Sequence, residues 1–344
     1  MKTEKHFEII KSTKSTLPNG VFVYRIRALV DLPKHGIKVG DMGGFVEHEG
    51  NLSGDAWVSG TARVSGNARV FGSARISGNA QVYGTARVSG TARVSGNAQV
   101  FDSAVVYGTA RVSGDARVSG NARVFGSARI SGNAQVYGTA RVSGTARVSG
   151  NAQVSGNAQV FDNARVSGDA RVSGTARVSG NAQVSGNAQV FDNARVSGNA
   201  QVYGVAGVGG SVQVAGNTQV SGHALVSGNA AVFGSAWVFG SAWVSGNAQV
   251  SGNAQVHGSA RIHGNAKVRN PSDYLTVGPA KSSGRMTHAH FDAKLGVRVT
   301  CGCFTGTVHE FSKAIEETHA GNQEYLEQYR LFCQLIAFNF GVKP

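Results

Sequence analysis

Two closely spaced pairs near the C-terminus are the clearest candidates for chemistry in this sequence. One residue separates His288 from His290, and one separates Cys301 from Cys303. Imidazole and thiolate are the ligands that zinc prefers, but this spacing on a strand places like side chains about 7 Å apart, which is wide for tetrahedral ligation. The register around residues 292–296 decides whether the two pairs share a face, so that point stays open. We expect no bound metal and buried free thiols.

Three further histidines lie inside a repetitive central segment. His257 and His263 occupy equivalent positions on either side of a turn, so a shared metal site would need a third histidine converging on them, and none is evident. His223 stands in a turn position that Asn or Thr usually occupies. We interpret it as a tolerated substitution and not as a catalytic base.

Arginines at a fixed spacing form the third candidate group. Residues 51–268 carry 17 Lys/Arg and 6 Asp/Glu, so most of the formal net charge of +14 lies there. If residues 18 apart are neighbours, like charges stack about 4.8 Å apart and each pair costs on the order of 1 kcal/mol in water. Bound polyanions would relieve this repulsion, whereas the simpler interpretation, which we prefer, is a solvated face. The candidate polyanion-binding residues are Arg75, Arg93, Arg111, Arg129, Arg147 and Arg165.

A six-residue repeat must position these arginines. From Val58 to Val268 an aliphatic residue returns every six positions through 36 repeats, without insertion or deletion. A small residue, nearly always Ala, stands two positions before it, and Gly stands two positions after it. Asp replaces this Gly at positions 102, 162 and 192. Less regular units at Val46 and Leu52 extend the frame backwards.

The repeat predicts short strands and not helices. Ala and the aliphatic residue are two apart, so on a strand both point inward while the Arg or Gln between them points outward. Gly supplies a corner of positive φ, which Asp also tolerates. Strands that turn at every repeat cannot form hairpins, and we expect them to coil as a parallel β-helix. A helix is excluded because Gly at every sixth position would cost it about 1 kcal/mol each.

The pattern resembles the hexapeptide-repeat proteins, which form a left-handed parallel β-helix with three repeats in each triangular coil. The resemblance covers residues 46–268. It implies the handedness and, with coils about 4.8 Å apart, a solenoid roughly 58 Å long. Residues 40–53 and 301–307 also resemble poorly characterised hexapeptide-repeat proteins of enterobacterial genomes and their prophages.

Many hexapeptide-repeat proteins are acyltransferases, so the resemblance implies an enzyme as one alternative. Those enzymes typically use a histidine base beside an acyl-donor cleft between the subunits of a trimer, often with a loop that projects from a coil. Here no loop interrupts the repeats, and no histidine site converges within them. We therefore predict no catalytic residue and no cofactor.

Both ends of the chain differ in composition from the repeat, and we expect them to close its open strand edges. Residues 1–45 would form an N-terminal capping segment, residues 46–268 the β-helix and residues 269–344 an α+β domain. In the last of these, residues 286–291 and 297–303 alternate as a β-hairpin. Two helices follow, the first opened by the capping box Thr307–Glu310 and the second carrying an apolar stripe. The stripe consists of Tyr325, Tyr329, Phe332, Cys333 and Ile336.

Large apolar residues replace Arg and Gln in the last repeats. Leu225 and Trp243 are 18 apart and should be neighbours on one face, with Trp237 on the adjacent face. An outward tryptophan on a solenoid indicates a covered or a binding surface. We predict an interface made of Leu225, Phe233, Trp237, Phe239 and Trp243, covered by the C-terminal domain, by a second subunit or by a partner protein.

Composition excludes several classes of protein. Glycine reaches 48 residues with only 5 prolines, which excludes collagen, and 41% hydrophobic content in a regular pattern argues against disorder. No run of about 18 apolar residues predicts a membrane helix, and no secretory signal is visible. With 3 cysteines, a disulfide framework is not expected, and we predict a cytoplasmic protein.

These observations predict a non-catalytic, elongated structural or interaction module, encoded by a bacterium or its prophage. We expect a homo-oligomer, and the resemblance implies a trimer. The alternatives are an acyltransferase-like enzyme and a protein that binds nucleic acid or another polyanion weakly through its arginines.

Overall fold

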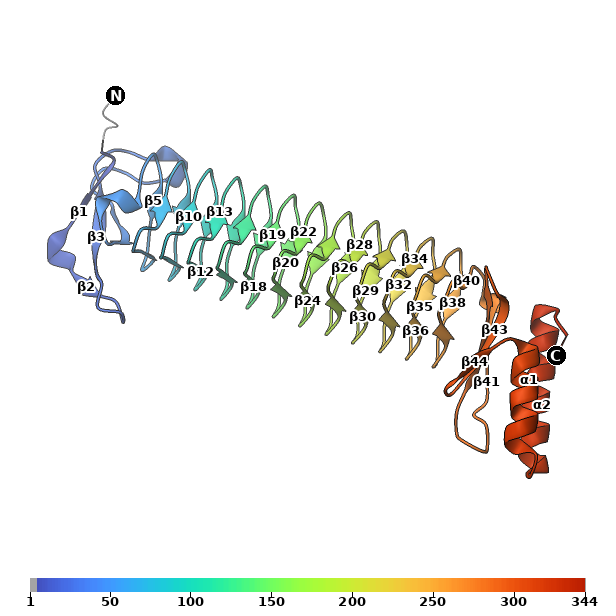
Figure 1. The fold of residues 1–344 in the computed structure, drawn as a ribbon. Coiled ribbons are helices and arrows are strands. Elements are labelled where there is room, and N and C mark those ends of the chain that lie inside the picture. The colour runs from blue at the N-terminus through green and yellow to red at the C-terminus, as the bar shows by residue number, and fades with distance from the viewer. Residues whose placement is uncertain (1–4, 344) are drawn as a thin grey trace. The chain divides into compact units, whose positions relative to one another are not determined.

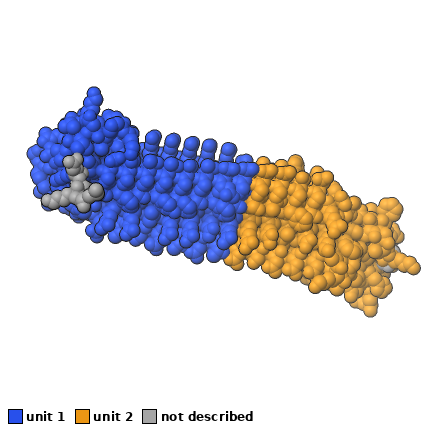
Figure 2. Space-filling view, turned by 90° about the horizontal axis from the view of Figure 1, so that it is seen from above, with its two compact units in different colours: residues 1–186 blue, residues 187–344 orange. Residues whose placement is uncertain are grey.

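The structure is a computed structural model that describes residues 5–343. The chain divides into two compact units, residues 1–186 and 187–344, which Figure 2 colours separately. Among residues 5–343, no helix is long and apolar enough to cross a membrane.

The N-terminal segment of the first unit is a small antiparallel sheet that joins the repeat. Strand β3 (Phe22–Ala28) pairs with β1 (Phe7–Ile9), β2 (Ser15–Thr16) and β4 (Met42–Val46), with the short 3-10 helices η1 (Lys11–Thr13), η2 (Pro33–His35) and η3 (Glu49–Asn51) between and after them. On its other edge, β4 pairs in parallel with β6 (Arg63–Val64).

The less regular repeats at Val46 and Leu52 continue the frame, as the sequence predicts. Val46 lies opposite Val64, and Leu52 forms a parallel bridge to Val70. Glycine is required beside this junction, because a Cβ on Gly44 would lie 2.7 Å from the carbonyl oxygen of Ala62. The N-terminal sheet therefore continues directly into the first coil.

The repeat of the first unit forms two-residue strands, each starting six residues after the one before. They run from β5 (Trp57–Val58) to β26 (Gln183–Val184), and each contains the outward residue and the aliphatic residue of one repeat. Every strand pairs in parallel with the third strand along, so three sheets run side by side and residues 18 apart are neighbours. Figure 1 shows the successive coils.

The interior and the corners follow the repeat. The inward Ala and aliphatic side chains have no exposed surface. Backbone N–H groups donate to the next coil, as Arg93 does to Ala110 O at 2.9 Å. The corner glycines have positive φ, and Asp102 adopts φ 55° in their place. Its carboxylate Oδ2 also accepts from the N–H of Gly120 at 3.0 Å, so this Asp adds a hydrogen bond between coils.

The second unit begins with the same architecture. Its repeat strands run from β27 (Gln189–Val190) to β40 (Lys267–Val268) in three parallel sheets, again with the inward side chains buried. The exceptions at the small position, Val212 and Thr218, point inward as well and are buried.

The C-terminal part of the second unit is a four-stranded antiparallel sheet with two helices. After the 3-10 helix η4 (Pro271–Asp273) come β41 (Tyr274–Val277), β42 (Thr287–Asp292), β43 (Gly296–Cys301) and β44 (Phe304–Gly306), hydrogen-bonded in that order. Helices α1 (Val308–His319) and α2 (Gln323–Phe340) follow. Ala289 and Val299 pack with α1 and α2 in one buried cluster, and Ala266 of the last coil bridges Asp292 on β42.

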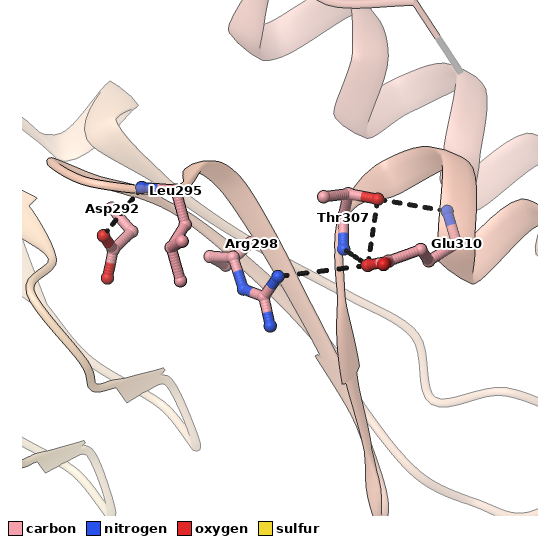
Figure 3. Close-up of polar contacts among 5 residues, drawn as sticks. All are labelled: Asp292, Leu295, Arg298, Thr307 and Glu310. Carbon is pink, nitrogen blue, oxygen red and sulfur yellow. Dashed lines mark hydrogen bonds and ion pairs between the residues drawn. The ribbon is translucent and has the colours of Figure 1, made fainter.

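The predicted hairpin is thus the centre of a larger sheet. Residue Gly302, with φ 60°, turns the chain so that Phe304 pairs with Cys301, and the expected strand 297–303 ends at Cys301. The predicted capping box is confirmed: Thr307 Oγ1 accepts from Glu310 N–H at 3.2 Å and Glu310 Oε2 accepts from Thr307 N–H at 2.7 Å (Figure 3). Arg298 on β43 lies 3.9 Å from the same carboxylate, which links α1 to the sheet.

The fold class predicted from the sequence is confirmed. The repeats form a parallel β-solenoid with three strands in each coil, and a small region of sheet and helices follows them. The apolar stripe predicted for the second helix is largely confirmed, since Tyr329, Cys333 and Ile336 are buried while Tyr325 is half-buried.

Candidate functional site

The six arginines of the predicted polyanion site lie in one column on a single sheet of the first unit. Register places Arg93 opposite both Arg75 and Arg111, and the same pairing continues to Arg165. We call these six residues the arginine column: Arg75, Arg93, Arg111, Arg129, Arg147 and Arg165. All are exposed except Arg75, whose Nη2 donates to His35 O at 2.8 Å.

No carboxylate neutralises this column. Within residues 5–343, none of its six guanidinium groups forms an ion pair. Residues 51–186 contain 14 Arg and 5 Asp, so the excess of positive charge is concentrated in the first unit. Neighbouring guanidinium groups, about 4.8 Å apart along the sheet, repel one another, and an anionic polymer would reduce that repulsion.

A second set of arginines in the same unit provides a comparison. Arg69, Arg87, Arg123 and Arg141 are exposed on another of the three sheets, where Val105 interrupts the run between Arg87 and Arg123. This set carries the same kind of charge on the same kind of strand but is not an unbroken column. It therefore separates an effect of net charge from an effect of the column.

The predicted interface residues are all at least partly exposed and lie on successive coils of the second unit. Leu225 on β33 (Leu225–Val226) pairs with Trp243 on β36 (Trp243–Val244), while Trp237 lies on β35 (Trp237–Val238) in a different sheet. Phe239 is half-buried and the other four side chains are 38–44% exposed. We call this set the aromatic patch: Leu225, Phe233, Trp237, Phe239 and Trp243.

The aromatic patch approaches the C-terminal part of the unit through His257. Phe239 contacts the edge of Trp237, with ring centroids 6.4 Å apart, and stacks on His257 at 5.2 Å. The ring of His257 in turn meets Tyr274 of β41 edge-on at 6.2 Å. Trp237 itself stays exposed, so within the described chain the C-terminal sheet does not cover it.

A histidine cluster forms where the last coil meets β42, which the sequence did not predict. The rings of His263 and His290 pack edge to face with centroids 4.9 Å apart, and His263 Nε2 lies 2.8 Å from Thr300 Oγ1. His290 packs against His263 alone and does not bring His257 and His263 together. His257 stacks on the aromatic patch instead. Among residues 5–343, no group of three or more His, Cys, Asp or Glu side chains could hold a metal ion.

Burial controls the charge of this cluster. Burial, together with the nearby Arg261 and His263, lowers the pKa of His288 to about 4, and burial is also the main cause that lowers the pKa of His290 to about 4. His290 is fully buried, and neither of its ring nitrogens has a hydrogen-bond partner within residues 5–343. Burial also lowers the pKa of His263. All three rings are consequently neutral at pH 7.

Asp292, on the same strand, has a different environment. Burial acts to raise its pKa, but the backbone N–H donors of Lys294, Asn265 and Leu295 outweigh that effect and hold the pKa below its ordinary value. Asn265 N–H donates to Asp292 Oδ2 at 2.7 Å, so a carboxylate on the C-terminal sheet holds the last coil.

Cys301 and the histidine pair lie on opposite faces of the C-terminal sheet, whereas Cys303 lies in the turn after β43. Cys301 pairs with Thr287, whereas His288 pairs with Thr300, and neighbouring residues on a strand point to opposite sides. The expectation of buried free thiols is wrong for this pair, since Cys301 is partly exposed and Cys303 is exposed. His223 is exposed in its turn, where its N–H donates to Gly240 O at 2.7 Å.

Side chains at the turns form hydrogen-bonded ladders that sequence reasoning missed. Asn79 Nδ2 donates to Asn97 Oδ1 at 3.0 Å, and Asn97 Nδ2 donates to Asp115 Oδ1 at 2.8 Å. Asn133 and Asn151 continue the same pattern. The recurrence of Asn, Thr, Ser and Asp at intervals of 18 was the available signal, and the ladders add polar bonds between coils.

One family model matches parts of the repeat. It is described as a YdcK beta solenoid repeat, and it matches residues 62–78, 92–108, 110–126, 116–132, 158–174, 188–204 and 248–264. The matches cover less than half of the chain and lie in both units. No curated protein matches the chain. Together with the coils, these matches support a β-solenoid repeat protein.

Proposed function

We propose that the chain is a non-catalytic structural module that assembles with further copies of itself through the aromatic patch. One observation carries this proposal: four large apolar side chains, 38–44% exposed, occur within residues 225–243 of a solenoid whose outward positions are otherwise mostly Arg and Gln. Exposed aromatic side chains at this density are typical of a protein interface.

The distribution of charge supports a second copy as the occupant. Residues 187–268 carry 3 Lys/Arg and 1 Asp, against 14 Arg and 5 Asp in residues 51–186. Two copies that meet at the aromatic patch therefore avoid most of the repulsion between their arginines. The resemblance to hexapeptide-repeat proteins supports a trimer, and the resemblance of residues 40–53 and 301–307 supports a bacterial or prophage origin. The exposed thiol of Cys303 supports a reducing cytoplasm.

Light scattering of the purified chain tests this proposal. We expect a multimer for the natural sequence and a monomer for the double variant Trp237→Arg with Phe233→Arg, because a buried guanidinium without a partner disfavours the interface. Tyr137→Arg is the matched control, since Tyr137 is 37% exposed on the first unit, outside the patch. A monomeric natural chain, or a double variant that keeps the mass of the multimer, contradicts the proposal.

We infer a second function for the first unit, weak binding of flexible polyanions by the arginine column. The observation in favour is the unbroken register of six guanidinium groups with no ion pair among the described residues. Duplex phosphates advance about 3.4 Å along each strand while the column repeats about every 4.8 Å, so a flexible single strand fits better than a duplex.

The dependence of single-stranded DNA binding on salt tests the arginine column. Replacing Arg93, Arg111, Arg129 and Arg147 by Gln should reduce the slope of log affinity against log salt by about 3, because each lost phosphate contact removes roughly 0.7. The matched control replaces Arg69, Arg87, Arg123 and Arg141 by Gln, which removes the same charge from the interrupted set. Equal losses from the two variants would indicate net charge alone and would contradict binding by the column.

A further inference from the structure

A cavity of about 660 Å³ lies in the second unit, between the side of the solenoid and the C-terminal sheet. Its solenoid wall includes Trp243 and, on β39 (Arg261–Ile262), Arg261. Its other wall includes Arg285, His288 and Thr300. This volume is in the range of small-molecule sites. Figure 1 shows the C-terminal sheet beside the last coils.

The charge of the cavity selects an anion. Two of the ten lining residues are arginines and none is acidic. Neither Arg261 nor Arg285 forms an ion pair within residues 5–343. Gly302 leaves room for the guanidinium of Arg285 at the β43–β44 turn, because a Cβ at residue 302 would lie 2.5 Å from Arg285 Nη1. His288 is neutral at pH 7, because its pKa is lowered to about 4, so it adds no net charge to the cavity.

The solenoid wall selects an aromatic ring. Trp243 is 43% exposed, and its orientation is fixed because Nε1 donates to Ser227 Oγ at 3.1 Å. The guanidinium carbon of Arg261 lies 5.9 Å from the centroid of the Trp243 ring. A planar ligand stacked on Trp243 would therefore bring an acidic substituent within reach of Arg261.

We propose that this cavity binds a small aromatic anion, with its ring stacked on Trp243 and its carboxylate or phosphate held by Arg261 and Arg285. The site shares Trp243 with the aromatic patch, so a ligand stacked there would compete with a second copy for that side chain, but it does not require self-association because Arg261 and Arg285 lie outside the patch. Carboxylate and phosphate share the chemistry that the two guanidinium groups recognise, so the experiment must separate them.

Calorimetric titration of the full-length chain with four probes tests the proposal. Adenosine monophosphate and adenosine-5′-carboxylate carry the same ring with a phosphate or a carboxylate, adenosine carries only the ring, and inorganic phosphate only the anion. We expect at least one aromatic anion to bind about tenfold or more tightly than adenosine or phosphate, because the charged contacts and the stacking act together. Which of the two binds more tightly identifies the acidic group. Failure of both aromatic anions to bind at millimolar concentration, or an affinity of both no higher than that of adenosine or phosphate, would overturn the proposal.

Variants with matched controls locate the site. Arg261→Gln and Arg285→Gln should each weaken the bound aromatic anion about tenfold or more, whereas Arg195→Gln, on a solenoid strand of the same unit outside the cavity, should leave the affinity unchanged. Binding should quench tryptophan fluorescence in Trp237→Phe but not in Trp243→Phe. Circular dichroism checks that each variant keeps the fold. Unchanged affinity in both cavity arginine variants, or quenching that survives Trp243→Phe, contradicts the assigned site.

Discussion

Acidification should release the C-terminal sheet and helices from the last coil, because the histidine cluster must stay neutral to remain buried. Burial holds the pKa of His288 and His290 at about 4, against an ordinary value of 6.5. Between pH about 6.5 and 4, the two histidines are therefore protonated in the unfolded state but not in the folded state. The contribution of each neutral ring to the free energy of unfolding is complete above pH about 6.5 and is lost progressively as the pH falls toward 4.

The pKa shifts set the size of the effect. Between pH about 7.5 and 5, each of the two rings removes about 2 kcal/mol from the free energy of unfolding, so the pair removes on the order of 4 kcal/mol. Protonation of His263, whose pKa burial also lowers, acts in the same direction. The positive charges of Arg261 and Arg298 disfavour protonation of the histidine cluster, whereas the negative charge of Asp292 favours it. The carboxylate of Asp292 stays ionised throughout this window because its pKa lies below the ordinary value.

Urea unfolding followed at 222 nm measures this loss selectively. Helices α1 and α2 are the only α-helices among residues 5–343, so the signal reports the C-terminal part of the chain. His290→Leu removes a buried ring that lacks hydrogen-bond partners and should abolish about half of the pH dependence. His223→Gln, at an exposed turn, should leave it unchanged. Identical urea midpoints at the two pH values, or a full pH dependence in His290→Leu, would refute the reasoning.

Three further substitutions test the fold. Ala122→Leu should lower the free energy of unfolding by about 1–3 kcal/mol in thermal unfolding, because Ala122 is fully buried and the larger side chain must overpack the interior. The outward Arg123→Gln should be nearly silent, and equal effects would contradict the register. Gly132→Ala should cost about 1–2 kcal/mol, since φ is 67° and a Cβ would meet Gly150 N and O at 3.0 Å; an unchanged melting temperature is the opposing result. Thr307→Ala removes the cap of α1 and should lower the free energy of unfolding, followed at 222 nm, by about 1 kcal/mol. Thr307→Ser should retain most of the stability that the cap provides.

The repeat made most of the solenoid predictable because its information is local. Alternation around Val94 or Val112 defines inward and outward positions, and the spacing of 18 that the resemblance implied placed Arg93 beside Arg111 and Leu225 beside Trp243. The positive φ of Asp102 followed from the glycine position it occupies.

The features that escaped prediction depend on contacts between distant segments. His263 meets His290 only because the C-terminal sheet packs on the last coil, and no spacing in the repeat encodes that contact. The opposite faces of His288 and Cys301 required the strand register that the sequence left open. Arg285 gave no signal of its own, since its role depends on a cavity whose other wall comes from the solenoid.

Hydroxyl-radical footprinting at dilute and concentrated protein tests the proposed self-association most directly, because it reads the exposure of individual aromatic side chains. Phe233, Trp237 and Trp243 should become protected as the concentration rises. Phe71, Tyr107 and Tyr137, which are 36–38% exposed on the first unit, should keep their reactivity and serve as internal references. Protection of the first-unit aromatics instead, or reactivity of the aromatic patch that does not change with concentration in a multimeric sample, would contradict assembly through the patch.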